Sequence, residues 1–397
     1  MKIKNFNWGP ALYILGYHLL LLIALPIYFF YFTPSWQIVV SSVVLLYLTG
    51  FSITAGYHRL YSHSTYKIHP VIEVILLFFS TMGTQGSVLR WAFDHRQHHA
   101  HVDTDRDPYS IKKGFWYAHF LWLLEKPKQI ENKVVADLLR KPLICFQHRF
   151  YTFLMLLTNG LTFLFIGWCF SDYLGAFLFV WFVRLFFLHH FTWFINSLAH
   201  TWGARTFCQE LSAVDNYLIS MLTFGEGYHN YHHTFCYDYR NGVRWYHFDP
   251  TKWLIWTLSK LGLAYQLKKN QHHFIEKRLI LERKQLLLDG IHSSFSDYKK
   301  IWEEKVIILT ESILDKLQQV RQVKEQYLLL KRSKEREKKA LSELSLQIKT
   351  IKNGLKVEYK RCKILSHQIM TFFPSLPDPS QSLVPDPNQY LVLDTEA

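Results

Sequence analysis

Long uncharged stretches alternate with charged segments in the first two thirds of the chain. Four of them are apolar runs of about 20 residues, the length at which a helix crosses the hydrocarbon core of a membrane. They cover residues 12–32, 36–55, 151–170 and 173–194. Short polar turns join the runs in pairs, so the pattern predicts two transmembrane hairpins. Arg184, the one charged residue within the runs, is expected to face protein.

A fifth apolar stretch, residues 71–83, contains Glu73 and is too short to span. We expect a buried or interfacial helix there. Both hairpin turns lack Lys and Arg, whereas segments 57–149 and 196–397 are rich in them. By the positive-inside rule, both termini and both long segments are predicted to be cytoplasmic.

The character of the chain changes from about residue 268. Apolar residues then recur at heptad spacing, which predicts a coiled coil or helical hairpin over residues 268–372. One seam holds Val306, Ile313, Val320 and Tyr327, and the other holds Leu341, Ile348, Leu355, Cys362 and Ile369, with Leu344, Ile351 and Leu365 as second positions and Glu358 as a fault. The proline-rich residues 373–397 are expected to be disordered. The predicted domains are therefore residues 1–267, 268–372 and 373–397.

Composition narrows the class of protein. The net charge of +14 fits either nucleic acid or an anionic membrane face. The four spans favour the membrane, so we expect no nucleic-acid partner. The five cysteines have no C-x-x-C spacing, which argues against a disulfide framework and a zinc–thiolate site. The number that stands out is 21 histidines.

Nine of these histidines lie in four groups. They are His58 and His63; His95, His98 and His99; His200; and His229, His232 and His233. On a helix, H-x-x-H-H spacing places three imidazoles on one side, where they can converge on a metal, and H-x-x-x-x-H can do so across a helix end. Neutral imidazole suits iron, copper, nickel or zinc. Nine nitrogens are too many for one ion and fit two ions with four or five ligands each.

Other metal and nucleotide motifs are missing. Carboxylate-bridged di-iron sites need two Glu-x-x-His motifs, and this chain has one, Glu226 to His229. The H-E-x-x-H, P-loop and G-x-G-x-x-G patterns do not occur. A nitrogen-rich dinuclear site remains, with iron or zinc open. Nine further histidines are interpreted as structural or interfacial: His18, His69, His119, His148, His189, His190, His247, His272 and His273.

Four motifs around the histidines resemble those of a known family. They are Gly56-Tyr-His-Arg-Leu-Tyr-Ser-His63, Trp91-Ala-Phe-Asp-His-Arg-Gln-His-His99, Asn196-Ser-Leu-Ala-His200 and Gly225-Glu-Gly-Tyr-His-Asn-Tyr-His-His-Thr-Phe235. About residues 10–265 resemble the membrane acyl-CoA Δ9-desaturases, the stearoyl-CoA desaturase-like family. The stretch from Asp238 to Trp253 looks like the bacterial branch, so we favour a bacterial inner membrane over the endoplasmic reticulum.

The resemblance implies an all-α membrane protein with a cytoplasmic cap. It implies two ferrous ions held by the nine clustered histidines, with Asn196 reaching one ion through water and O2 as co-substrate. Gln85, Trp91, Thr192 and Trp193 match positions that shape a bent acyl tunnel, Leu46 and Gly50 match its closed end, and Lys126 matches a contact to the CoA phosphates. Apart from the resemblance, Asp94 is a candidate hydrogen-bond partner for the second nitrogen of a ligand ring, with solvent-facing helix capping as the alternative.

The expected activity is O2-dependent introduction of a cis double bond, at Δ9, into a saturated fatty acyl chain. The di-iron centre performs the chemistry, with no separate side-chain base. CoA is favoured over acyl carrier protein as the acyl carrier, and a phospholipid stays open. A membrane hydroxylase and a histidine-rich metal transporter or sensor are the alternatives.

Partners follow from what the chain lacks. It has no His-Pro-Gly-Gly haem motif and no iron–sulfur cysteines, so we expect an external donor of the ferredoxin or cytochrome b5 type with its reductase. Lys112, Lys113, Arg244 and Lys252 are candidates for docking it. Membrane lipid is a further partner, and the C-terminal helices are candidates for homo-oligomerisation or for binding a partner.

Overall fold

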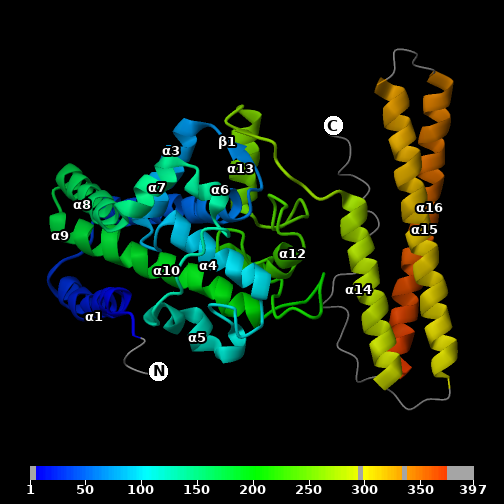
Figure 1. The fold of residues 1–397 in the computed structure, drawn as a ribbon, viewed down its shortest axis with the longest axis horizontal. Coiled ribbons are helices and arrows are strands. Elements are labelled where there is room, and N and C mark those ends of the chain that lie inside the picture. The colour runs from blue at the N-terminus through cyan, green and yellow to red at the C-terminus, as the bar shows by residue number, and fades with distance from the viewer. Residues whose placement is uncertain (1–5, 294–297, 333–337, 373–397) are drawn as a thin grey trace. The chain divides into compact units, whose positions relative to one another are not determined.

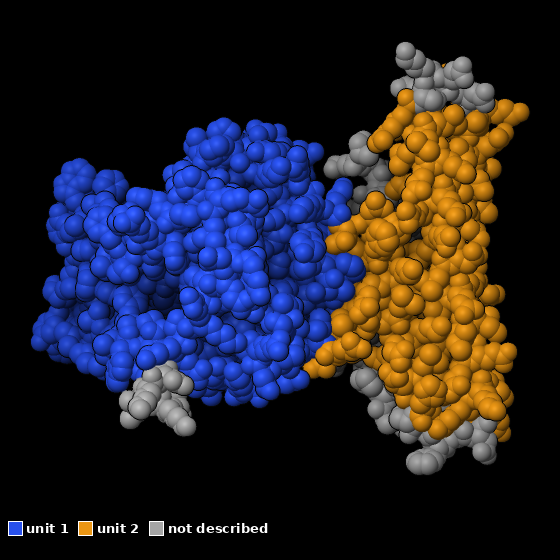
Figure 2. Space-filling model, in the orientation of Figure 1, with its two compact units in different colours: residues 1–203, 211–269 blue, residues 204–210, 270–397 orange. Residues whose placement is uncertain are grey.

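The computed structural model describes residues 6–293, 298–332 and 338–372, and these are mostly helical (Figure 1). The chain divides into two compact units, shown in different colours in Figure 2. The first comprises residues 1–203 and 211–269, and the second comprises residues 204–210 and 270–397.

Four helices of the first unit are long and apolar enough to cross a membrane, which confirms the expected spans. The first is α1 (Trp8–Tyr31) and the third is α8 (Tyr151–Phe170). The second is α2 (Trp36–Phe51), continued by a π-helical segment, Ser52–Ser62. The fourth comprises α9 (Tyr173–Gly175), a π-helical segment (Ala176–Val183), α10 (Arg184–Asn196) and a 3₁₀ turn (Leu198–His200). The second and fourth helices thus extend beyond the expected apolar runs and carry histidines.

The turns between paired spans follow from local chemistry. The side chain of Ser35 accepts a hydrogen bond from the Ile38 amide and caps α2. In the other turn Ser171 adopts the left-handed conformation, and Asp172 accepts a 2.7 Å hydrogen bond from the Gly175 amide. The short polar sequences Pro34-Ser35 and Ser171-Asp172 therefore each end one helix and start the next.

Polar contacts join the spans on their protein-facing sides. The Ser42 hydroxyl donates to the Phe179 carbonyl at 2.8 Å. Arg184 is buried and donates to the Val180 carbonyl and to the Asn159 side chain. It therefore faces protein as expected, while large apolar side chains such as Leu22 and Phe30 are exposed on the outer surface of the spans, where lipid would cover them.

The remaining elements of the first unit are short. The fifth apolar stretch forms α3 (Pro70–Met82), a helix too short to cross a membrane, as expected. The others are α4 (Val88–His101), 3₁₀ turns at Ile111–Lys113 and Leu121–Leu124, α5 (Phe115–His119), α6 (Ala136–Leu139), α7 (Pro142–Arg149), α11 (Tyr217–Leu222), α12 (His229–Thr234) and α13 (Pro250–Lys260). Strands β1 (Lys67–Ile68) and β2 (Ala264–Tyr265) pair antiparallel, Lys67 opposite Tyr265. This pair ties the segment after the first histidines to the end of the unit.

Among its described residues the second unit contains three long helices, whereas the heptads indicate two. They are α14 (His272–Ser293), α15 (Lys299–Arg332) and α16 (Lys338–Phe372). The helical extension is thus confirmed, and α14 adds Ile280 and Leu287 to its core. Glu358, the fault in the second seam, accepts a 3.1 Å hydrogen bond from the Lys316 ammonium. The tail expected to be disordered, residues 373–397, lies outside the described residues.

Candidate metal centre

The first histidine pair lies on the π-helical end of the second span. In a π-helix the amide of residue i+5 bonds the carbonyl of residue i. The His63 amide makes such a bond to the His58 carbonyl at 3.2 Å. The spacing H-x-x-x-x-H therefore matches one turn of this helix, and both rings point to the same side. The spacing alone predicts a pair that converges across a helix end, without indicating the π-helical geometry.

The two H-x-x-H-H motifs lie on helices α4 and α12. The clustered histidines form two groups, and each motif contributes rings to both of them. His95 and His99, four residues apart, join one group, whereas His98 joins another. On α12, His232 joins the first group and His229 and His233 join the second. The expectation that one motif converges on one metal is therefore wrong. The 100° step between neighbouring helical residues separates His98 from His99 and His232 from His233.

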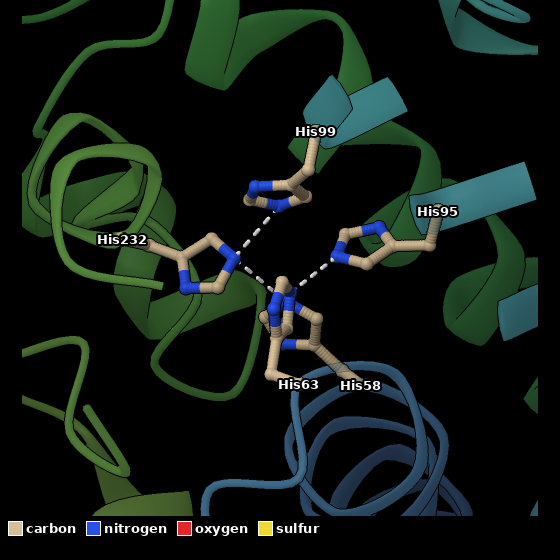
Figure 3. A group of neighbouring side chains, drawn as sticks. All are labelled: His58, His63, His95, His99 and His232. Atoms are coloured by element: carbon tan, nitrogen blue, oxygen red, sulfur yellow. Dashed lines mark hydrogen bonds between the residues drawn. The ribbon is translucent and has the colours of Figure 1, made fainter. Parts of the chain in front are cut away.

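Nine imidazoles thus form two groups. His58, His63, His95, His99 and His232 form the first, drawn in Figure 3, and His98, His200, His229 and His233 form the second. Within each group one ring nitrogen of every member lies within 4.8 Å of the others. The rings of His99 and His233, one from each group, stack with centroids 4.2 Å apart. The two groups are therefore neighbours, as a dinuclear site requires.

Ring nitrogens meet closely inside each group. The Nε2 atoms of His58 and His232 lie 3.0 Å apart, and those of His63 and His95 lie 2.8 Å apart. In the second group the Nε2 atoms of His229 and His233 lie 3.1 Å apart. A metal bonded to imidazole at about 2.1 Å keeps ligand nitrogens about 3.0 Å apart at a right angle and about 3.4 Å apart in a tetrahedron. The spacing of the nitrogens fits an ion at the middle of each group.

Acceptors on the outer side of the rings set the direction of the lone pairs. The His98 Nδ1 atom lies 2.9 Å from Asp107, and the His58 Nδ1 atom lies 2.9 Å from Glu226. A carboxylate only accepts, so the hydrogen bond to Asp107 places the proton of His98 on Nδ1 and leaves its Nε2 to present a lone pair to the group. The His58 Nδ1 atom faces Glu226 at ion-pair distance without a hydrogen bond of good geometry. The His200 Nε2 atom is buried and has no hydrogen-bond partner among the described residues. These are lone pairs that a metal ion would satisfy.

Electrostatics keep the rings in the ligating form. Burial first, and then the neighbouring imidazoles, lower the pKa values of six of these histidines well below the usual range. The six are His63, His95, His99, His229, His232 and His233. They are therefore neutral near pH 7, the protonation state in which imidazole binds a metal.

A buried ion-pair network supports the first group. Arg59, adjacent to His58, donates to Glu226 at 2.9 Å and to Asp249 at 2.9 Å, and all three side chains are buried. Burial alone would raise the pKa of the Glu226 carboxyl, but Arg59 and His58 lower it below the usual value. Glu226 thus stays ionised and orients the His58 ring.

Several supporting residues were missed from sequence. Besides Glu226 and Asp107, they are Tyr109, whose hydroxyl lies 3.2 Å from His95 Nδ1, and Ser212, whose hydroxyl lies 2.7 Å from His200 Nδ1. The sequence identifies Glu226 only as part of its single Glu-x-x-His motif. Nothing local marks Ser212, since it lies twelve residues from the ring that it orients.

Asp94 does not play the role expected of it. Its carboxylate accepts from Arg90 Nε at 2.8 Å, an i,i+4 pair on α4. The prediction was wrong because Asp94 directly precedes His95, so the helix turns its side chain away from the ring. Arg90 then neutralises it locally.

The expected tunnel residues lie beside the histidines or among the spans. Gln85 donates to the Thr192 hydroxyl at 2.9 Å, and Trp91 stacks on His95 with centroids 4.9 Å apart. Trp193 is buried against α1. Leu46 packs near Phe224, and the Gly50 backbone abuts the Phe224 ring.

The other expected site residues are less enclosed. Asn196 is half-buried at the end of α10, four residues before His200, and does not belong to either histidine group. Lys126 is exposed on an irregular segment. Their expected roles stay predictions.

The four basic residues expected to dock an electron donor differ in their exposure. Lys112 and Lys113 are exposed. Lys252 is buried instead, and its ammonium donates to the Gly242 carbonyl at 2.7 Å; Arg244 is buried as well. The expectation that Lys252 and Arg244 present charge to a partner is therefore wrong, because they hold the loop before α13.

The sequence comparisons agree with this geometry. Residues 34–269 match the fatty acid desaturase family. A probable acyl-CoA desaturase of Schizosaccharomyces pombe is 40% identical over 293 residues, which cover 72% of this chain and 59% of the relative. Acyl-CoA desaturase 1 of Saccharomyces cerevisiae is 40% identical over 283 residues, 69% of this chain and 55% of the relative. The sn-2 palmitoyl-lipid 9-desaturase of Nostoc is 38% identical over 237 residues, 58% of this chain and 81% of the relative.

The alignments cover less than two thirds of the length of the two fungal relatives. The match to the family nevertheless includes all nine clustered histidines and three of the four spans, from residue 34 to residue 269. The chain therefore belongs to the fatty acid desaturase family.

Proposed function

We propose that this chain is an O2-dependent acyl desaturase that introduces a cis double bond, at Δ9, into a saturated fatty acyl chain. The observation that carries the proposal is the pair of adjacent, buried histidine groups on one end of four apolar spans. The names of relatives support it, since fungal and mammalian relatives are named acyl-CoA or stearoyl-CoA desaturases.

The proposed cofactor is a pair of iron ions, one in each histidine group. When bound, two irons supply the oxidising power that an unactivated alkyl C–H bond requires, with O2 as co-substrate. Overall, the acyl chain gives up two hydrogen atoms, and O2 takes up these together with two electrons and two protons. The products are one alkene and two water molecules.

The chain's own residues orient the histidine ligands and keep bulk water from the site. Asp107, Glu226, Tyr109 and Ser212 hold the outer ring nitrogens and thereby fix the orientation of the ligands. The histidines are almost all buried, so bulk water is kept from the site. We propose that Asn196 contributes through a water molecule, and that Gln85, Trp91, Thr192 and Trp193 line the path of the acyl chain beside the rings.

For the acyl carrier we propose CoA, with Lys126 contacting its phosphates. Relatives are named both for acyl-CoA and, in Nostoc and Anabaena variabilis, for acyl lipids. Turnover of stearoyl-CoA against a stearoyl phospholipid in detergent separates the two carriers. Loss of the CoA reaction alone in Lys126→Ala would assign that contact.

The electrons are proposed to come from a separate protein of the ferredoxin or cytochrome b5 type. Lys112 and Lys113 are exposed cations on the histidine-bearing unit and are the remaining candidates for its docking. We also propose that both termini are cytoplasmic, in a bacterial inner membrane. Residues 1–267 form the proposed desaturase domain, and residues 268–372 a helical extension for self-association or a partner.

Lipid analysis of a host that makes no unsaturated fatty acids tests the function. Cells expressing the wild type should gain a monounsaturated fatty acid, and cells expressing His98→Ala should not. A product heavier by one oxygen atom would instead indicate a hydroxylase. Metal flux across vesicles without consumption of O2 would indicate a transporter.

A further inference from the structure

The loop between His200 and Ser212 passes through both compact units. His200 belongs to the second histidine group, and the Ser212 hydroxyl lies 2.7 Å from its Nδ1 atom. Both residues lie in the first unit, whereas residues 204–210 between them belong to the second. The chain therefore leaves the histidine-bearing unit shortly after a ligand and returns shortly before the residue that orients the same ligand.

Both ends of this loop are fixed within the first unit. The Val214 amide donates to the Ala199 carbonyl at 2.8 Å and joins the two ends. The Ser212 amide donates to Asp103 at 2.8 Å, and the Ser212 hydroxyl donates to the other oxygen of the same carboxylate. Because that hydroxyl has one proton, it accepts from His200 Nδ1 and leaves the buried Nε2 atom to present a lone pair.

The middle of the loop is held by α14 inside the second unit. The Gln209 amide donates to Oε2 of Glu282 at 3.0 Å, and Nε of Arg278 donates to the Phe207 carbonyl at 2.9 Å. Phe207 and Cys208 are buried. Surface loops normally turn their backbone polar groups to water, whereas two backbone groups of this loop pair with charged side chains of one helix.

Arg278 and Glu282 act together. They lie one helical turn apart on α14, and their side chains form an ion pair at 2.6 Å. Each side chain therefore has one partner on its own helix and another on the loop. The Glu282 side chain is 15% exposed, so its hydrogen bond to Gln209 is charge-assisted and partly shielded from water. Two side chains held in this way restrain the loop more firmly than a mobile surface pair does.

We propose that α14 positions the His200 ligand through this loop, with Arg278 and Glu282 as positioning residues for the second histidine group. The C-terminal extension thereby sets how tightly that group holds its metal ion. The inference rests on the proposed pair of iron ions. The second group has four rings against five in the first, so a displaced His200 removes a larger share of its ligands.

Glu282→Ala in the full chain tests the proposal, because it removes the acceptor of the Gln209 amide and the ion-pair partner of Arg278. Fe²⁺ is titrated without O2 into purified apoprotein in detergent. We expect one of the two ions to bind about tenfold more weakly and the other to bind as in the wild type, since losing the support of a ligand ring costs at least that much. Glu282→Gln keeps an oxygen that accepts from the amide and should recover most of the affinity.

A double variant shows whether the effect passes through His200. In the His200→Ala background the ring is already absent, so adding Glu282→Ala should weaken binding of Fe²⁺ no further. Glu325→Ala is the matched control, because it breaks an i,i+4 ion pair with Arg321 on α15 of the same unit. This control should bind both ions as the wild type does.

The results separate two levels of inference. If the wild type does not bind two ions per chain, the proposed metal pair is wrong. If the wild type binds two and folded Glu282→Ala keeps both affinities, the positioning role is wrong. The role is also wrong if Glu282→Ala weakens binding equally with and without the His200 ring. Should Glu282→Ala not fold, Arg278→Gln takes its place under the same criteria, because it removes the charged donor to the Phe207 carbonyl.

Discussion

The Nδ1 atom of His98 lies 2.9 Å from the Oδ1 atom of Asp107, and both side chains are buried. The pair connects a ring of the second group to the loop after α4, where Asp107 also accepts from the Tyr109 amide at 3.1 Å. One carboxylate thus shapes a loop and orients a ligand.

Removal of this charge should weaken metal binding without unfolding the protein. Asp107→Asn keeps the shape of the side chain but no longer demands a proton on His98 Nδ1. We expect a loss of about 10- to 100-fold in metal affinity or activity, the usual effect of losing such a partner. Iron titration of apoprotein measures it. Asp105→Asn, at an exposed position two residues away, should match the wild type; equal affinity in both variants would contradict the role of Asp107.

Neighbouring histidines on α12 should affect different metal ions. His232 belongs to the group of five rings and His233 to the group of four. His233→Ala leaves three rings in its group, whereas His232→Ala leaves four, so we expect greater metal loss from His233→Ala. Elemental analysis of purified variants should give about one iron per chain for His233→Ala and closer to two for His232→Ala. The same loss in both would argue against the division into two groups.

The network around Arg59 should dominate the stability of the cap. Glu226→Gln removes one of its two carboxylate partners and leaves an incompletely paired buried charge, which costs about 3 kcal/mol. Denaturation in detergent micelles should show this shift. Asp137→Asn provides the comparison, because Asp137 pairs with Arg96 at a partly exposed site and such pairs contribute about 1 kcal/mol or less. The interpretation fails if the two variants lose similar stability.

Gly354 on α16 offers a test confined to the helical extension. An added Cβ would meet only the Lys316 side chain, at 3.4 Å from Cε and 3.7 Å from Cδ, which are ordinary contacts. Gly354→Ala should therefore stabilise the helix by about 0.8 kcal/mol, the difference in helix propensity. Amide exchange along α16 in the full chain should slow, while acyl desaturation stays unchanged. Faster exchange would mean that the helix does not tolerate the methyl group.

Local pattern was sufficient for much of this protein. The four spans follow from runs of uncharged residues, since a membrane requires about 20 apolar residues in a helix wherever they occur. The histidines that converge were also recognisable, because two H-x-x-H-H motifs and two shorter groups place rings on one helical side. The heptads likewise predicted the helical extension, although α14 went unnoticed as its third helix.

What only the tertiary structure decided is how residues distant in sequence meet. It places His98 and His99 in different groups. It pairs Asp94 with Arg90 and buries Lys252. It also brings three distant side chains to the histidine rings, those of Asp107, Ser212 and Glu226. It also set Phe224 against Gly50. Spacing along one helix predicts which side chains share a side, but the partner that a buried polar or aromatic group finds depends on which helices pack beside it.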